Sequence, residues 1–242
     1  GMQRIMTNAL PTMYPDSKYA DCMPIGSLDV INNFLYQDIR DYYAKWYRPD
    51  LQGIMIVGDI NVDEMEAKLK KVFADVKAPV HPANRIYYPV ADNQEPLIFI
   101  GTDKEIETPS ISFFFKSEAF PDSLKNTINY YGIQYMLSMG ISMLNSRLAE
   151  IRQQADPPFT GASAGYGDFF VAKTKSAFGI DASSKIGGIE LAMKTILEEA
   201  ERARRFGFTA TEYERARANY MQGVESAYNE REKPKSGSYV NE

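Results

Sequence analysis

The sequence predicts an α+β fold, in which helices pack on one face of a mainly antiparallel sheet. Two segments rich in Ile and Phe, residues 97–102 and 110–116, have the composition of β-strands. Residues 160–166 and 175–182 have the length and small-residue content of a β-hairpin, and a long helical region precedes them. Two amphipathic helices then close the chain. Because strands and helices come in separate runs and do not alternate, helices layered on one sheet face are favoured.

The composition is that of an ordinary globular protein. The chain has 242 residues, 44% of them hydrophobic and 24% charged, which allows one large domain or two smaller ones. A formal net charge of -5 disfavours a nucleic-acid-binding surface. No apolar run approaches the ~18 residues of a membrane span. Cys22 is the only cysteine, so the chain has no internal disulfide framework.

A proline-rich linker divides the chain. Residues 77–96 contain four of the 13 prolines, a density that favours extended backbone and marks a domain boundary. We therefore expect a first α/β region over residues 1–78, a linker over residues 79–96 and a second α/β region over residues 97–242.

The first region is predicted to form a helix, a strand and a second helix. The first helix carries an aromatic and apolar face at helical spacing, which we expect to lie in the core. That face consists of Ile39, Tyr42, Tyr43, Trp46 and Tyr47. Pro49 ends the helix, because the residue before a proline is disfavoured in the α conformation. The run GIMIVG at residues 53–58 predicts a buried strand, and Asn61 with Glu64 forms a capping box for the next helix.

Further helices are predicted from their boundaries. They cover residues 2–10, 123–154, 186–206 and 209–232. Pro157 lies just beyond the second of these, and Gly207 ends the third. Thr209 and Glu212 form a capping box at the start of the fourth.

A Pro-x-Gly turn, a helix ending in Tyr-x-Pro, a strand ending in Val-Gly-Asp and an amphipathic helix follow one another in the first half of the chain. Their residues are Pro24, Gly26, Phe34, Tyr43, Tyr47, Arg48, Pro49, Val57, Gly58, Asp59 and Phe73. In this order and spacing the pattern resembles the pitrilysin/insulinase family of zinc metallopeptidases, which includes the mitochondrial processing peptidases. The similarity continues more loosely to the C-terminus.

The resemblance implies two-layer lobes of the LuxS/processing-peptidase type. It also implies that the chain is an internal fragment of a longer protein, and a Gly before Met2 fits a piece excised for expression. Residues 1–78 would be the C-terminal part of the first peptidase domain. Residues 97–242 would be the second, non-catalytic domain, truncated at its C-terminus.

The family holds zinc with a His-x-x-Glu-His motif and a more distant glutamate, and both precede the Pro-x-Gly turn. The ligands would therefore lie upstream of residue 1. We expect zinc in the parent chain, and no metal ligand and no catalytic residue in this segment, which has a single histidine.

Peptides or unfolded polypeptides are the substrates that the resemblance implies, together with an enclosed chamber built by the remaining domains of the parent chain. This segment would then be structural and substrate-enclosing, and inactive alone. Its substrate-binding residues are not identified by the sequence. A likeness to exported bacterial members points to the bacterial periplasm or cell envelope.

Several residues are candidates for catalysis or binding, and each has a simpler interpretation. His81 lies in the proline-rich linker, a poor platform for catalysis, so we expect an exposed linker residue. Cys22 has no histidine on a neighbouring element, which favours a small buried hydrophobe. The acidic and basic residues at 198–205 fit a solvated helix face.

The sequence Gly165-Tyr166-Gly167-Asp168 resembles the start of a phosphate-binding loop. It lacks the third glycine and does not open a helix, so glycines of a hairpin are the better interpretation.

Three hypotheses remain. The favoured one is an internal fragment of a zinc metalloendopeptidase. The second is a non-catalytic homologue that acts as a scaffold or partner subunit of such a peptidase. The third discards the resemblance and takes the chain as an α+β binding module with no enzyme relative.

Overall fold

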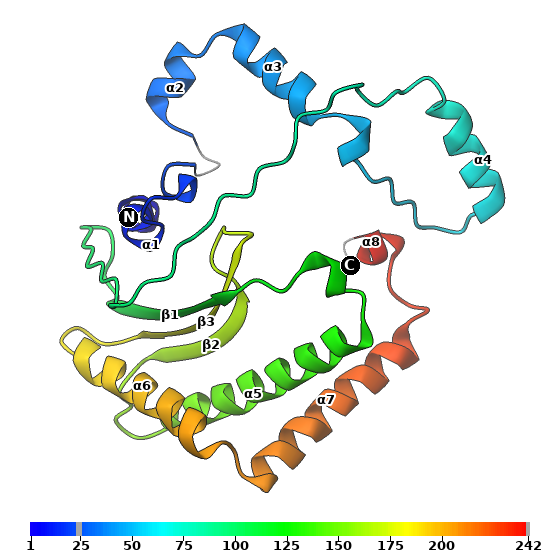
Figure 1. Cartoon of the computed structure of the whole chain (residues 1–242). Coiled ribbons are helices and arrows are strands. Elements are labelled where there is room, and N and C mark those ends of the chain that lie inside the picture. Colours follow the sequence, from blue (N-terminus) through cyan, green and yellow to red (C-terminus); the bar gives the residue numbers. More distant parts are fainter. Residues whose placement is uncertain (23–25, 241–242) are drawn as a thin grey trace. The chain divides into compact units, whose positions relative to one another are not determined.

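The computed structural model describes residues 1–22 and 26–240 (Figure 1). Pro24 of the predicted Pro-x-Gly turn lies outside the described residues. The chain forms two compact units, one made of residues 1–22 with 87–222 and the other of residues 26–86 with 223–240. The boundary between residues 86 and 87 falls within the segment predicted as a linker, and the N-terminal residues belong to the unit that contains the sheet.

The first unit is built on a three-stranded antiparallel sheet. Its strands are β1 (Ser110–Glu118), β2 (Gly161–Asp168) and β3 (Lys175–Ser183), in the order β1-β3-β2. The register places Gly179 of β3 opposite Phe114 of β1 and Gly165 of β2. The predicted strand at residues 110–116 and the predicted hairpin are confirmed.

Two helices cover one face of this sheet (Figure 1). They are α5 (Ile128–Arg152) and α6 (Ile189–Phe206). The core between helices and sheet consists of Leu144, Leu148, Phe159, Ala164, Ile180, Ala182, Ala192 and Ile196. Burial of such side chains contributes roughly 1.5–3 kcal/mol for each large one. The mixed fold with helices on an antiparallel sheet is confirmed.

A second, smaller core joins the N-terminus to the turn between β2 and β3. Helix α1 (Met2–Met13) leads into a short 3-10 turn, η1 (Lys18–Ala20). The buried residues here are Leu10, Tyr14, Val90, Phe169, Ala172 and Ala177. Residues 2–10 are helical, as the sequence predicts.

The last long helix, α7 (Ala210–Glu230), starts at the predicted capping box. The backbone N–H of Thr209 donates to Glu212, and the N–H of Glu212 donates to the Thr209 hydroxyl. The first half of α7 packs on α5 through Met139, Met143 and Ala216. Gly207, with φ +67°, lets the chain turn between α6 and α7 in the left-handed region. A further 3-10 turn, η3 (Asp122–Leu124), precedes α5.

The second unit is a series of helices without a sheet among its described residues. They are α2 (Leu28–Asn33), α3 (Tyr36–Trp46), η2 (Pro49–Leu51), α4 (Val62–Val72) and α8 (Ser236–Val240). Ser27 caps α2 and Asn61 caps α4, each by accepting a backbone N–H.

The prediction that the aromatic face of α3 lies in a core is wrong for this structure. Tyr42 and Tyr43 are each 61% exposed, and the described helices α2, α3 and α4 bury no residue. The reason is that an amphipathic helix buries its apolar face only against a second layer, and none is present in the described part of this unit.

Two predicted strands are also absent. Residues 53–58 and 97–102 have extended or irregular backbone but no ladder partner in the described chain. Residues typical of strands favour a half-buried surface that is paired with a neighbouring strand. Without such a neighbour, these two segments do not form strands. Ile54 and Ile98 are accordingly exposed.

Candidate functional site

The residues weighed as catalytic candidates are not brought together. His81 lies exposed in an irregular segment of the second unit. Cys22 is an exposed free thiol, so the prediction of a buried hydrophobe is wrong: it follows the short turn η1 and no core element covers it. Within the described residues, no group of three or more His, Cys, Asp and Glu side chains is placed to hold a metal ion.

The glycine pair at Gly165 and Gly167 lies inside strand β2 and forms no loop. The hydroxyl groups of Tyr166 and of Ser117 in β1 share a hydrogen bond at 3.0 Å. Asp168 forms an ion pair with Lys173 at 2.9 Å. The hairpin interpretation of this sequence is therefore confirmed.

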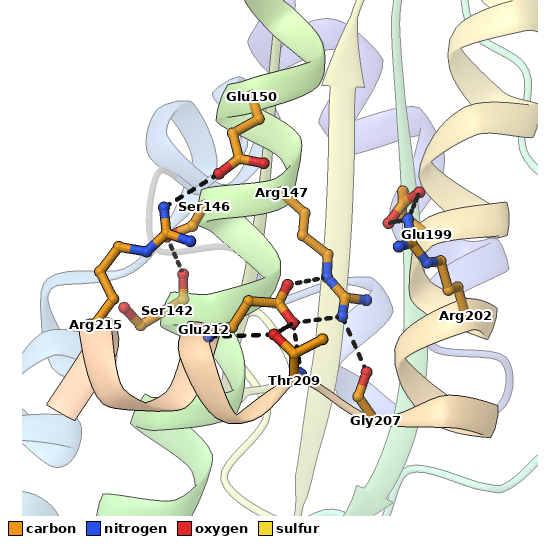
Figure 2. A network of polar contacts seen from close by, with 10 residues as sticks. All are labelled: Ser142, Ser146, Arg147, Glu150, Glu199, Arg202, Gly207, Thr209, Glu212 and Arg215. Atoms are coloured by element: carbon orange, nitrogen blue, oxygen red, sulfur yellow. Dashed lines mark hydrogen bonds and ion pairs between the residues drawn. The ribbon is translucent and has the colours of Figure 1, made fainter.

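A network of polar contacts in the first unit joins α5 to the start of α7 (Figure 2). Arg147 of α5 forms a bidentate pair with Glu212, through Nε at 2.5 Å and Nη2 at 3.0 Å. The same Nη2 donates to the carbonyl oxygen of Gly207 at 3.0 Å. The Arg147 side chain is 10% exposed, and its guanidinium lies 4.6 Å from the centre of the Phe208 ring.

This pair is charged at neutral pH and is suited to structure, not to proton transfer. The Arg147 guanidinium, with the backbone N–H of Thr209, lowers the pKa of Glu212 to about 2. The hydrogen bonds that Arg147 donates to Glu212 raise the pKa of Arg147. A general acid or base needs a pKa near the working pH. The cavity beside the pair measures about 20 Å³, which is room for a single water molecule.

A second ion pair extends the group to the surface. Arg215 lies 3.4 Å from Glu150, and both side chains are more than half exposed. On α6, Glu201 pairs with Arg204 and Arg205, and Arg202 pairs with Glu199 (Figure 2 shows the latter pair). The prediction of a solvated, ion-paired helix face at residues 198–205 is confirmed.

Lys175 at the start of β3 is a buried charge with two carboxylate partners. Its side chain is 6% exposed, and its ammonium lies 3.0 Å from Asp92 and also pairs with Glu118 of β1. The hydrogen bond to Glu118 raises the pKa of Lys175. The group ties Asp92 to the sheet and keeps the lysine protonated, which excludes a nucleophilic role.

At the β2 edge of the sheet, a side chain pairs with the backbone of one residue, Ala164. The N–H of Phe169 donates to the carbonyl oxygen of Lys175, so odd-numbered residues of β2 turn their backbone groups toward β3 and even-numbered residues turn theirs away. Ala164 therefore faces the outer edge. Asn145 of α5 accepts the Ala164 N–H at 2.7 Å and donates to the Ala164 carbonyl oxygen at 2.9 Å. Its amide thus takes the place of a neighbouring peptide group.

The other edge of the sheet is open. The N–H of Ser184 donates to the carbonyl oxygen of Pro109, so odd-numbered residues of β1 face β3. The backbone groups of Ser112, Phe114 and Lys116 consequently point outward, and no residue of the described chain forms a hydrogen bond with them. An open edge of this kind accepts a further strand.

The turn between β2 and β3 is held in a strained conformation. Phe170 has φ +56°, which is unusual for a bulky residue. Tyr14 of the N-terminal segment is fully buried, donates to the carbonyl oxygen of Phe169 at 2.6 Å and accepts the N–H of Val171 at 3.2 Å. Tyr19 accepts the N–H of Lys173 at 3.1 Å.

Sequence reasoning missed Arg147, Asn145 and Tyr14. Arg147 had a usable signal, because it lies between Leu144 and Leu148 on a buried helical stripe and a buried arginine needs a carboxylate. Asn145 and Tyr14 act on segments 19 and 155 residues away, and no local pattern points to such partners.

The comparisons of this chain with known proteins agree on one family. Residues 33–220 match the family model described as the peptidase M16 inactive domain. A zinc protease PQQL-like protein of Arabidopsis thaliana is 27% identical over 231 residues, which is 95% of this chain and 21% of that protein. The probable zinc protease PqqL of Escherichia coli (strain K12) is 26% identical over 146 residues, covering 60% of this chain and 15% of that protein.

The fold has a solved counterpart. The crystal structure of the periplasmic protease PqqL from Escherichia coli matches with a TM-score of 0.84 and 19% sequence identity, over 100% of this chain and 26% of that one. At this identity the likeness supports the fold alone. The chain spans about a fifth or less of the length of these two sequence relatives.

Proposed function

The chain belongs to the family of the peptidase M16 inactive domain, and from this premise we propose that it is a structural, substrate-enclosing part of a longer zinc-dependent metalloendopeptidase. The third hypothesis, a binding module with no enzyme relative, is overturned by the family match.

One observation carries the structural role. The helices of the second unit present apolar faces that its own described residues leave uncovered, with Leu28, Tyr36 and Val62 each more than 70% exposed. Apolar surface of this extent marks an interaction surface. We propose that other domains of the longer protein cover it, since the helices are too short and too exposed to be stable alone.

The residues that bind zinc in the longer protein would lie outside this chain. The described side chains do not fit a zinc site, because they offer no group of three potential ligands and the single histidine is exposed in an irregular segment. No catalytic step is therefore assigned to this chain. The ligands are proposed to precede it.

Peptides are the proposed substrates, as the relatives are described as zinc proteases. The cell envelope is the proposed compartment, because the Escherichia coli relative of known structure is described as periplasmic. Among the described helices, none is both long and apolar enough for a membrane crossing.

A scaffold function is the alternative. An inactive-type domain also fits a partner subunit that has lost the metal motif. The residues of this chain are compatible with a segment of an active peptidase and with such a subunit.

The decisive experiment uses the longer protein, extended upstream through the whole preceding domain. Zinc content and cleavage of an unstructured peptide are measured with and without a chelator. Zinc near one per chain with chelator-sensitive cleavage is expected. A folded protein with neither zinc nor cleavage would overturn the peptidase proposal and favour the scaffold.

A further inference from the structure

Residues 97–102 and the open edge of β1 are complementary features of the same unit. The segment LIFIGT is rich in strand-forming residues, yet Ile98 is 76% and Ile100 87% exposed. A few residues further along the chain, β1 has outward-facing backbone groups that no residue of the described chain pairs with. An exposed apolar segment with strand-forming residues is unfavourable, and so is a strand edge whose backbone groups are unpaired.

The chain between the two already reverses its direction. The N–H of Ile106 donates to the carbonyl oxygen of Asp103 at 3.0 Å, which closes a four-residue turn. The N–H of Glu105 also donates to the Asp103 side chain at 3.0 Å, a typical stabilisation of such turns. Arg4 of α1 pairs with Asp103 at 2.7 Å and with Glu105 at 2.9 Å, so the turn is anchored to the first unit.

The turn sets a single hairpin register. With Asp103 opposite Ile106, continued antiparallel pairing places Phe99 opposite Ser110, Ile98 opposite Ile111 and Leu97 opposite Ser112. Even-numbered residues would then exchange hydrogen bonds with the added strand, and these are the residues whose backbone groups point outward on β1.

The side-chain faces agree with this register. Ile111 packs partly buried against the core beneath α5 and α6, so Ile98 opposite it would extend that core. Gly101 would lie on the opposite face, and it already approaches Ile5 of α1: a Cβ at Gly101 would be 3.1 Å from the Ile5 side chain.

We propose that residues 97–102 form a strap that closes the open edge of β1 as the outer strand of a hairpin. In the closed state the strap would pair along the edge of β1, whereas at the β2 edge Asn145 pairs with the backbone of Ala164. In the open state, which the structure shows, β1 is free to accept an extended chain. The inference rests on the geometry of this unit and does not depend on the proteolytic role.

Two proline substitutions test the strap with a matched control. In the proposed register the N–H of Phe99 donates to β1, whereas the N–H of Ile98 points away from it. Amide hydrogen exchange of Ser110 and Ser112 is measured in the 242-residue chain. We expect Phe99→Pro to speed their exchange about ten-fold or more and Ile98→Pro to change it little, since local opening controls exchange. Equal rates in the parent sequence and in both variants would overturn the proposal.

A cysteine pair gives an independent readout of the register. In a Cys22→Ser background, Ile98→Cys with Ile111→Cys places two thiols at a non-hydrogen-bonded pair, the close type of cross-strand pair. Ile100→Cys with Ile111→Cys is the control, offset by two residues along the same strap. Mild oxidation is expected to link the first pair about ten-fold faster than the second, because a disulfide tolerates little displacement. Equal rates would contradict the register.

Discussion

At the scale of single residues, the pair between Arg147 and Glu212 links three segments of the first unit. It joins α5, the turn after α6 and the start of α7 through one guanidinium. The sequence already showed Glu212 as a capping residue, because a capping box is a local pattern. It could not show that the same carboxylate also binds an arginine 65 residues away.

Arg147→Met should lower the free energy of unfolding by about 3 kcal/mol, since removing one partner leaves a largely buried charge without compensation. Urea unfolding measures the difference. The matched control is Arg215→Met, which removes the exposed pair with Glu150 and should cost about 1 kcal/mol or less. Equal losses in the two variants would show that the Arg147 pair is not the stronger contact.

The same pair predicts a dependence of stability on pH. Arg147, and then the Thr209 N–H, lower the pKa of Glu212 from 4.5 to about 2 in the folded chain. A depressed folded pKa means that this contribution is fully present above 4.5 and is lost as the pH falls toward 2. The free energy of unfolding should therefore fall over this window. Glu212→Gln should remove that part of the slope, and an unchanged slope would contradict the assignment.

At the scale of elements, agreement between prediction and structure follows the range of the interactions. The helices with local caps, such as α4 and α7, begin where their capping residues predict. The strands β1, β2 and β3 form because each has a neighbour in the described chain. Residues 53–58 and 97–102 have equally strand-like sequences and form none, because strand formation depends on a partner that local sequence does not specify.

The pairing of Asn145 with the β2 edge gives a prediction at this scale. Asn145→Ala removes both hydrogen bonds to Ala164, which is 8% exposed. Leaving these backbone groups unpaired should cost about 1–3 kcal/mol and should add to the unpaired edge, which promotes association. Urea unfolding and light scattering are the measurements. Ser146→Ala, which alters an exposed hydroxyl one residue further along α5, is the control and should behave like the parent sequence.

At the scale of the whole molecule, the family resemblance predicted from Tyr43, Pro49 and Gly58 is confirmed by the match over residues 33–220. The sequence alone also indicated α+β architecture, which the structure has in its first unit. It could not indicate that the aromatic face of α3 would stay exposed, because periodicity shows which face is apolar and not whether a second layer is present.

We propose that this chain supplies structure, and no zinc chemistry, to a longer peptidase. The most direct test is to measure zinc bound per chain and cleavage of an unstructured peptide by the 242-residue chain itself. A buffer containing micromolar zinc is used, with the upstream-extended protein assayed in parallel. We expect no stoichiometric zinc and no chelator-sensitive cleavage from this chain, and both from the extended protein. Zinc near one per chain with cleavage by the 242-residue chain alone would contradict the account.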